Sequence, residues 1–338
     1  MKSIATLSKE ELQNKHVIVR AGLDVPLDAS GNVADLYRLR KAVPTLKFLS
    51  DAGAKVIVLS HIGRKPEETN EPVARALNAV IPVFYVPDLL GVPARQAVAA
   101  MKPGQILVLE NLRSDERETA NDEGFARELA SLGDIYVDDA FSAAHRVHAS
   151  IVGIPKFVPS YAGLLLSEEV ENLLRARTPE SPSFAILGGA KFETKAPLIK
   201  LLLETHDHVF VTGALANDVF VARGLSVGVS LVSEELPTPE VLNHPHFLAP
   251  VDVTVERADE QAQVKQPDAV LADERVVDIG PDSLALIAPF IMNAKSNVGA
   301  AGLMQVMPTT AKYVAKKIGM NGFNVSQLSD MNTNLTLG

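Results

Sequence analysis

Short runs of β-branched and other apolar residues alternate with longer amphipathic segments along the first half of the chain. The runs read as buried strands: HVIVR (16–20), KVIVLS (55–60), PVFYVP (82–87), QILVLE (105–110) and DIYVDD (134–139). The segments between them read as helices: 36–53, 71–81, 92–101 and 122–133. Successive strand–helix units predict an α/β fold with a parallel, doubly wound sheet, because parallel neighbours need a helical crossover.

The same alternation restarts after a segment that ends in Pro and Ser. SEEVENLLRARTPESPS (167–183) predicts a helix followed by a domain joint. FAILGGAK (184–191) and HVFVTGALAN (208–217) then read as strands that run into turns, 247–256 as one further strand, and 276–295 as a turn and a helix. At 338 residues the chain is long enough for two domains.

We therefore predict two Rossmann-like parallel-sheet domains joined by a helix, with the second domain incomplete. The predicted parts are a first domain over 1–166, the helix and joint over 167–183, a partial second domain over 184–295, and a tail over 296–338 whose composition shifts to small and amide residues.

Composition excludes several classes of function. The chain has no Cys, which excludes disulfides, thiol catalysis and Cys-ligated metals. A net charge of −9 argues against nucleic acid as the main partner. No apolar run approaches the roughly 18 to 20 residues of a membrane span, and the polar N-terminus has no signal-peptide core. We expect a cytoplasmic protein with no membrane partner.

Basic side chains follow the predicted strands of the first half. Ligands of open α/β sheets sit outside the carboxyl ends of the strands, so these side chains are expected at one rim. They are Arg38, Arg64, Arg113 and Arg146, with His61 beside them and Asp24 after the first strand. Arg binds phosphate and carboxylate groups bidentately, so a small polyanion is the predicted ligand. The alternative is that each Arg is a solvated surface residue.

Histidine pairs raise the question of a metal. His145 and His148 have a spacing that suits a metal pair, but no third ligand set at metal spacing accompanies them. We predict no protein metal site and read these histidines as hydrogen-bonded loop residues.

AILGGAKFETKA, in the second half, reads as a strand, a glycine pair and a helix start. Backbone N–H groups at such a turn can cradle phosphate oxygens, and Lys191 and Lys195 share one face of the predicted helix. The segment is neither a Walker A loop nor a G-x-G-x-x-G fingerprint. Together with the rim in the other domain, it suggests phosphoryl transfer between two bound anions.

An ordered set of motifs over about residues 14–295 resembles the phosphoglycerate kinase family. The motifs are SHIGR, LENLR, DAFSAAHRVHAS, AGLLLSEEVENL, AILGGAKFETK, VGVSLV, PVDV and DIGP. The resemblance implies reversible phosphoryl transfer between 1,3-bisphosphoglycerate and ADP, with Mg²⁺ accompanying ATP or ADP and 3-phosphoglycerate as the acid. We expect a monomer that acts on these small molecules.

The resemblance also assigns roles to residues of this chain. The substrate-binding set is Asp24, Arg38, His61, Arg64, Arg113 and Arg146. The nucleotide-binding set is Gly188, Gly189, Lys191, Lys195 and Gly213. Arg38 and Lys191 would be catalytic, stabilising the charge of the phosphoryl group in transfer once the domains close.

The chain departs from the family's pattern at several of these motifs. RVDFNVP reads RAGLDVP, which places Gly22 and Asp24 where the family has Asp and Asn; Asp138, Thr194 and Val229 are further departures. The family's later WNGPMG-like and GGGD turns are not found after Lys295. We therefore expect weak or absent turnover. The alternative function is a non-catalytic anion-binding α/β protein.

The tail resembles a different family, the lytic transglycosylases, through GAAGLMQVMP (299–308). The place of that family's catalytic Glu falls on Ile287, and a general acid cannot be Ile, so Gln305 of the motif can only bind. A peptidoglycan-cleaving enzyme is thus a third and weaker alternative. We expect residues 296–338 to pack loosely and the second sheet to have an exposed edge.

Overall fold

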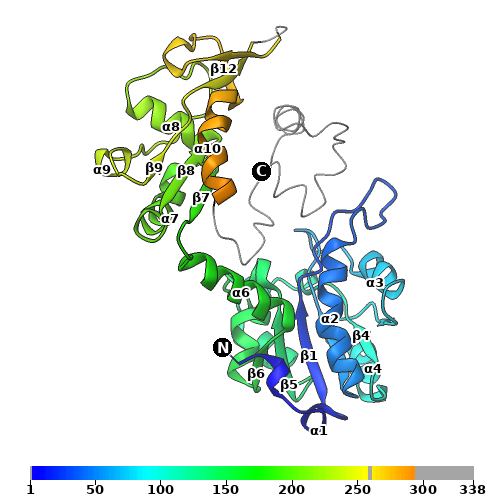
Figure 1. Ribbon diagram of the computed structural model, residues 1–338. Coiled ribbons are helices and arrows are strands. Elements are labelled where there is room, and N and C mark those ends of the chain that lie inside the picture. Colours follow the sequence, from blue (N-terminus) through cyan, green and yellow to red (C-terminus); the bar gives the residue numbers. More distant parts are fainter. Residues whose placement is uncertain (1, 258–260, 294–338) are drawn as a thin grey trace, which may run out of the picture. The chain divides into compact units, whose positions relative to one another are not determined.

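The computed structural model describes residues 2–257 and 261–293 (Figure 1). The chain forms two compact units, unit 1 over Met1–Glu171 and unit 2 over Asn172–Gly338. The boundary between them falls within the helix α6 (Leu164–Arg177). The predictions about residues 296–338 lie outside the described residues.

Unit 1 is built on one six-stranded sheet in the order β3-β4-β2-β1-β5-β6, in which every pair of neighbours is parallel. The strands are β1 (His16–Ala21), β2 (Lys55–Leu59), β3 (Phe84–Tyr85), β4 (Ile106–Val108), β5 (Ile135–Asp139) and β6 (Ser160–Ala162). The chain winds from β1 first toward β2 and later toward β5. The predicted parallel, doubly wound sheet is confirmed, and its switch point lies between β1 and β5.

Helices cover both faces of this sheet, which explains its continuous apolar strands. Val17 and Val19 of β1 lie in one core cluster together with residues of α2 (Tyr37–Asp51) and α3 (Glu71–Asn78). Ile18 lies in the other cluster, with α4 (Val92–Ala100) and α5 (Glu123–Ala130). Side chains alternate between faces along a strand, so a strand buried on both faces must be apolar at every position.

Unit 2 contains two smaller sheets. The first, β7-β8-β9, is parallel and consists of β7 (Phe184–Gly188), β8 (His208–Thr212) and β9 (Phe247–Leu248); its helices are α7 (Phe192–Thr205), α8 (Ala214–Ala222) and α9 (Pro239–Leu242). The second, β11-β10-β12, is antiparallel and consists of β10 (Val253–Glu256), β11 (Gln263–Lys265) and β12 (Arg275–Ile279); α10 (Pro281–Asn293) follows it.

The single strand predicted over 247–256 is wrong, because the segment divides into β9 and β10 in different sheets. Pro250 lies at the break and has no N–H to donate to a ladder. The amides of Val251 and Asp252 donate to the Ser283 hydroxyl at 2.9 and 3.1 Å instead. Asp252 then accepts from the first amides of α10, so this stretch serves as a helix cap.

Smaller differences also separate prediction from structure. The helix predicted after the glycine pair is α7, which begins at Phe192, and the short strands β6 and β11 were not predicted. The end of the segment 208–217, predicted as a turn, is helical, since α8 begins at Ala214 soon after β8 ends at Thr212. No helix of the described residues is long and apolar enough to cross a membrane.

Candidate functional site

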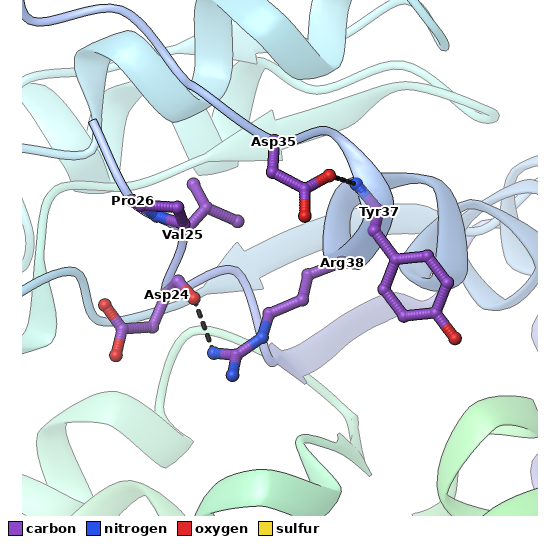
Figure 2. A pocket seen from close by; sticks show the side chains of 6 residues that line it. All are labelled: Asp24, Val25, Pro26, Asp35, Tyr37 and Arg38. Atoms are coloured by element: carbon purple, nitrogen blue, oxygen red, sulfur yellow. Dashed lines mark hydrogen bonds between the residues drawn. The ribbon is translucent and has the colours of Figure 1, made fainter. Parts of the chain in front are cut away.

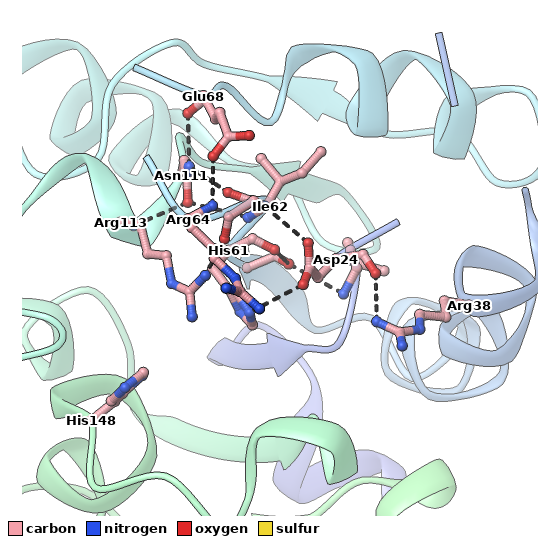
Figure 3. Close-up of polar contacts among 12 residues, drawn as sticks. Asp24, Arg38, His61, Ile62, Arg64, Glu68, Asn111, Arg113 and His148 are labelled. Atoms are coloured by element: carbon pink, nitrogen blue, oxygen red, sulfur yellow. Dashed lines mark hydrogen bonds and ion pairs between the residues drawn. The ribbon is translucent and has the colours of Figure 1, made fainter. Parts of the chain in front are cut away.

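The carboxyl ends of β1, β2, β4 and β5 bring the predicted basic residues together in unit 1. Figure 3 shows most of them converging from separate loops. We call this group the anion rim; its members are Asp24, Arg38, His61, Arg64, Arg113 and Arg146. The loops after β1, β2, β4 and β5 and the first turn of α2 supply them.

Asp24 connects three parts of the rim. Its Oδ1 accepts a hydrogen bond of 2.9 Å from the Gly63 amide, and its Oδ2 lies 3.6 Å from His61 Nε2. Its backbone carbonyl accepts from Arg38 Nη1 at 2.5 Å, and the two residues line a surface hollow with Val25, Pro26, Asp35 and Tyr37 (Figure 2). Asp24 therefore orients its neighbours, although its charge has the same sign as the predicted ligand.

Arginine side chains lie close enough in the rim to influence one another. The pKa of Arg113 is lowered by burial first and then by Arg146, with a smaller effect of the same sign from Arg64. Asp24 opposes this shift. Like charges gathered in one place repel, and a bound anion removes that repulsion. The arrangement is suited to a small ligand with several negative charges.

The loop after β2 is held rigidly against the loop after β4. Arg113 donates to the Gly63 carbonyl. Buried Asn111 accepts from the Arg113 and Ile62 amides at 3.0 and 3.3 Å and donates to the Ile62 carbonyl at 3.0 Å. The carboxylate of Glu68 accepts from the amides of Arg64 and Lys65, both at 2.6 Å.

Gly63 is the residue that this loop conformation requires. Its φ is +63°, and a Cβ atom there would lie 2.0 Å from the Glu68 carboxylate. Sequence reasoning missed Asn111 and Glu68 because both side chains bind backbone groups of these two loops, and backbone partners leave no side-chain motif in the sequence. The only available signal was the Asn within LENLR, where a polar residue interrupts an apolar stretch.

Arg20 is a further residue that sequence reasoning missed. It is the last but one residue of β1 and is fully buried, and it contacts His61. Burial first, then Arg20, Arg113 and Arg146, lower the pKa of His61 to about 2. His61 is therefore a neutral imidazole at physiological pH. A charge inside a run as apolar as HVIVRAGL was the sequence signal.

The departures from the family pattern occupy definite places. Asp138 near the end of β5 accepts from the Ala140 amide at 3.0 Å, and burial raises its pKa. A Cβ atom on Gly22 would make only ordinary contacts, 3.6 Å from Ala140 and Ser142, so packing alone does not demand glycine there. Val229 is 64% exposed in unit 2.

The predicted glycines of unit 2 meet at the carboxyl ends of β7 and β8. Gly188 pairs with Thr212 in the sheet, and a Cβ atom on Gly213 would lie 3.8 Å from the Gly189 amide nitrogen. Gly213 has φ +64° and ψ −146°, a conformation that only glycine adopts readily. We call Gly188–Gly189 and Gly213 the glycine turns.

Each glycine turn leads into a helix. The residues before α7 and α8 are Lys191 and Gly213, and neither forms a side-chain capping hydrogen bond. The side chain of Lys195 lies over Gly189, with its Cε 3.5 Å from the position of a Cβ there. Exposed Lys191 stands at the start of the same helix. Two adjacent helix N-termini and two cations form a surface suited to phosphate.

A serine of unit 2 accepts a hydrogen bond from one backbone amide of this surface. Ser233 Oγ accepts from the Phe192 amide at 2.8 Å, and the Ser233 amide and hydroxyl donate to Asp218 at 2.7 and 2.8 Å. Burial raises the pKa of Asp218, and Glu193 adds to the rise. Among the described residues, no group of three or more His, Asp or Glu side chains could hold a metal ion.

Comparisons with known proteins bear on the family and the fold of this chain. A family model described as phosphoglycerate kinase matches residues 7–316. The phosphoglycerate kinase of Moorella thermoacetica is 41% identical over 321 residues, which cover 89% of this chain and 81% of that protein. The one from Bradyrhizobium diazoefficiens is 39% identical over 338 residues, with 92% and 84% covered.

A solved structure shows the same fold. The phosphoglycerate kinase of Coxiella burnetii aligns with a TM-score of 0.75 at 32% identity, covering 99% of this chain and 92% of that one. The match of the family model continues past Lys295. The predicted end of the resemblance at that residue, and with it the truncated second domain and the transglycosylase fragment, is not supported by these comparisons.

Proposed function

The chain belongs to the phosphoglycerate kinase family of phosphotransferases, which transfer a phosphoryl group reversibly between 1,3-bisphosphoglycerate and ADP, and we propose that its anion rim binds the acid. The observation that carries this proposal is that Arg64, Arg113 and Arg146 follow three strands of the parallel sheet and lie close enough together for Arg146 and Arg64 to lower the pKa of Arg113. Arg38 joins them through Asp24. 3-Phosphoglycerate, with a carboxylate and a phosphate, has the complementary charge.

We assign the nucleotide phosphates to the glycine turns of unit 2. Gly188, Gly189 and Gly213 allow phosphate oxygens to approach backbone amides, and Lys191 and Lys195 supply positive charge. In this division of roles, residues 1–166 bind the acid, residues 167–183 join the domains, and residues 184–295 bind the nucleotide. Arg38 and Lys191 stabilise the charge of the phosphoryl group during transfer.

Magnesium fits this division only as a companion of the nucleotide. Asp218 is the buried carboxylate next to the start of α7, and both of its oxygens already accept from Ser233. Mg²⁺ usually keeps several waters and binds through one or two carboxylates plus substrate phosphates. The described residues thus offer no cage for the ion, and no step is assigned to it.

We further propose a cytoplasmic monomer that acts on small molecules. A glycan-related role rests only on the sequence motif at 299–308. Ile287, at the place of the missing catalytic Glu, is a buried residue of α10, so that place offers neither an acid nor access to solvent. We therefore assign no glycan cleavage to this chain.

Separate titrations of the full chain with 3-phosphoglycerate and with MgADP, followed by a coupled turnover assay, test the proposal. We expect both ligands to bind. Arg113→Ala should raise the Kd for 3-phosphoglycerate about tenfold or more and leave the Kd for MgADP unchanged. Arg127→Ala is the control, since Arg127 is an exposed residue of α5 outside the rim that pairs with Glu123 one turn away and lies over the Phe157 ring. Acid binding without nucleotide binding would support the non-catalytic alternative.

A further inference from the structure

A charged network buried from solvent lies beneath the anion rim. Arg20 and Ser150 are fully buried, and Glu118 is 1% exposed. Arg20 Nε donates to Ser150 Oγ at 3.0 Å, and Ser150 Oγ donates to Glu118 Oε1 at 2.5 Å. The Ser150 amide donates to the other carboxylate oxygen at 2.9 Å. The hydroxyl thus connects a buried cation with a buried anion, and the pairing makes both charges tolerable in the interior.

The same guanidinium reaches the ring of His61. Arg20 Nη2 lies 2.6 Å from His61 Nδ1. Arginine has only donors and keeps its protons in proteins, so Nδ1 must be the acceptor. The proton of the neutral ring then resides on Nε2, which lies on the rim side, 3.6 Å from Asp24 Oδ2 (Figure 3).

We propose that Arg20 is a positioning residue for the rim: by donating to Nδ1, it holds His61 as the neutral tautomer whose Nε2–H donates to an oxygen of the bound acid. The inference rests on the proposed function of the rim. Glu118, through Ser150, keeps Arg20 in place. The rim thereby contains one donor that carries no charge and does not repel its arginine neighbours.

The ionisation of His61 agrees with this arrangement. Its pKa is about 2, with burial as the largest cause and Arg20 as the next. The groups that face it are Arg20, Arg113, Arg146 and His148, with Asp24 the nearby carboxylate. The Nε2–H donor is therefore present unchanged across the physiological range of pH.

Nitrogen-15 NMR of the histidine rings in the full chain tests the tautomer directly. The His61 signals are assigned by their loss in His61→Gln. We expect Nδ1 without a proton and Nε2 with one at pH 7, and the same pattern at pH 5. A proton on Nδ1 at pH 7, or a ring that titrates near its ordinary pKa of about 6.5, overturns the proposal.

The role of Arg20 is tested by Arg20→Gln combined with Glu118→Gln, which removes both buried charges so that neither is left unpaired. We expect the pKa of His61 to rise in this double variant while staying below its ordinary value, because burial, Arg113 and Arg146 still lower it. The Kd for 3-phosphoglycerate at pH 8 should rise about tenfold. Adding His61→Gln should then produce little further loss. The control Arg127→Gln should leave both the titration and the Kd unchanged.

The outcomes separate the inference from the proposed function. An unchanged His61 titration and Kd in the folded double variant contradict the role of Arg20. A chain with the expected tautomer that fails to bind 3-phosphoglycerate at any pH refutes the rim as an acid site, and with it the positioning role.

Discussion

The two candidate sites of this molecule are built in opposite ways. In unit 1 the anion rim consists of charged side chains, and buried polar residues such as Asn111 and Arg20 hold their loops and rings in place. In unit 2 the glycine turns consist mainly of backbone, and shape matters more than side-chain charge. The difference teaches that a charge-based site needs a rigid support beneath it, whereas a backbone-based site needs residues without side chains.

The hydrophobic cores beneath the two sites also differ. Replacing one buried leucine by alanine in each core should have the largest effect among these predictions. Leu46 of α2 is fully buried in the core of the six-stranded sheet, whereas Leu203 of α7 is 4% exposed beside a three-stranded one. We expect Leu46→Ala to lower the free energy of unfolding by about 2–5 kcal/mol, and Leu203→Ala by less, because its site can collapse more easily.

Urea unfolding followed by circular dichroism measures both changes, with exposed Leu174 as the control position. Equal losses, or a larger loss for Leu203→Ala, would show that the two cores support their sites equally well.

Removing one positive charge from the rim should have the next largest effect. Arg38→Ala is expected to lower kcat about 10²- to 10³-fold, because a cation that stabilises the transferred phosphoryl group is lost. The KM for ADP should stay the same, since the glycine turns are intact. Arg40→Ala, two residues further along α2 on another face, is the matched control in the coupled assay. A similar loss for Arg40→Ala would mean that Arg38 acts only through general charge.

A backbone-based site should respond to a methyl group. Gly213→Ala is expected to lower the free energy of unfolding by about 1–3 kcal/mol, because its φ of +64° with ψ of −146° strains any other residue. Gly188→Ala introduces no such strain, and its Cβ would make an ordinary contact of 3.6 Å with Thr212. Thermal unfolding compares the two variants, and Gly213→Ala should have the lower midpoint temperature. Equal midpoint temperatures would show that the positive φ of Gly213 does not require glycine.

The smallest expected effect is the pH dependence that His61 imposes on unit 1. The ring stays neutral when folded, with a pKa of about 2, but takes up a proton below about pH 6.5 when unfolded. Stability is therefore lost as the pH falls below 6.5, by at most about 1.4 kcal/mol per pH unit from this residue. Urea titrations at pH 7, 6 and 5 give the free energy of unfolding at each pH. This free energy should change less steeply with pH in His61→Gln than in the unchanged chain.

His148 and His206 also have lowered pKa values, caused first by burial, so part of the slope should survive in that variant. An unchanged slope would mean that His61 ionises alike in both states.

Much of the first unit could be predicted from the sequence because the signals there are local. Apolar runs with flanking turns identify strands, and the parallel sheet then brings residues that follow different strands to one edge. Arg64 and Arg113 could be placed near each other on that ground alone. The division of 247–256 was missed although Pro250 within the run is a local signal against one continuous strand. Only the structure shows that the Ser283 hydroxyl accepts hydrogen bonds from the Val251 and Asp252 amides.

By itself, the sequence determined the α/β alternation, the edge at which the arginines gather and the glycines before α7, because periodicity and strand order need only neighbouring residues. Only the tertiary structure decided that Arg20 lies inside the core, that Glu118 balances it through Ser150, and that His61 is neutral. A buried charge is tolerated only with its partners in place, and these partners come from separate segments that meet only in the folded chain.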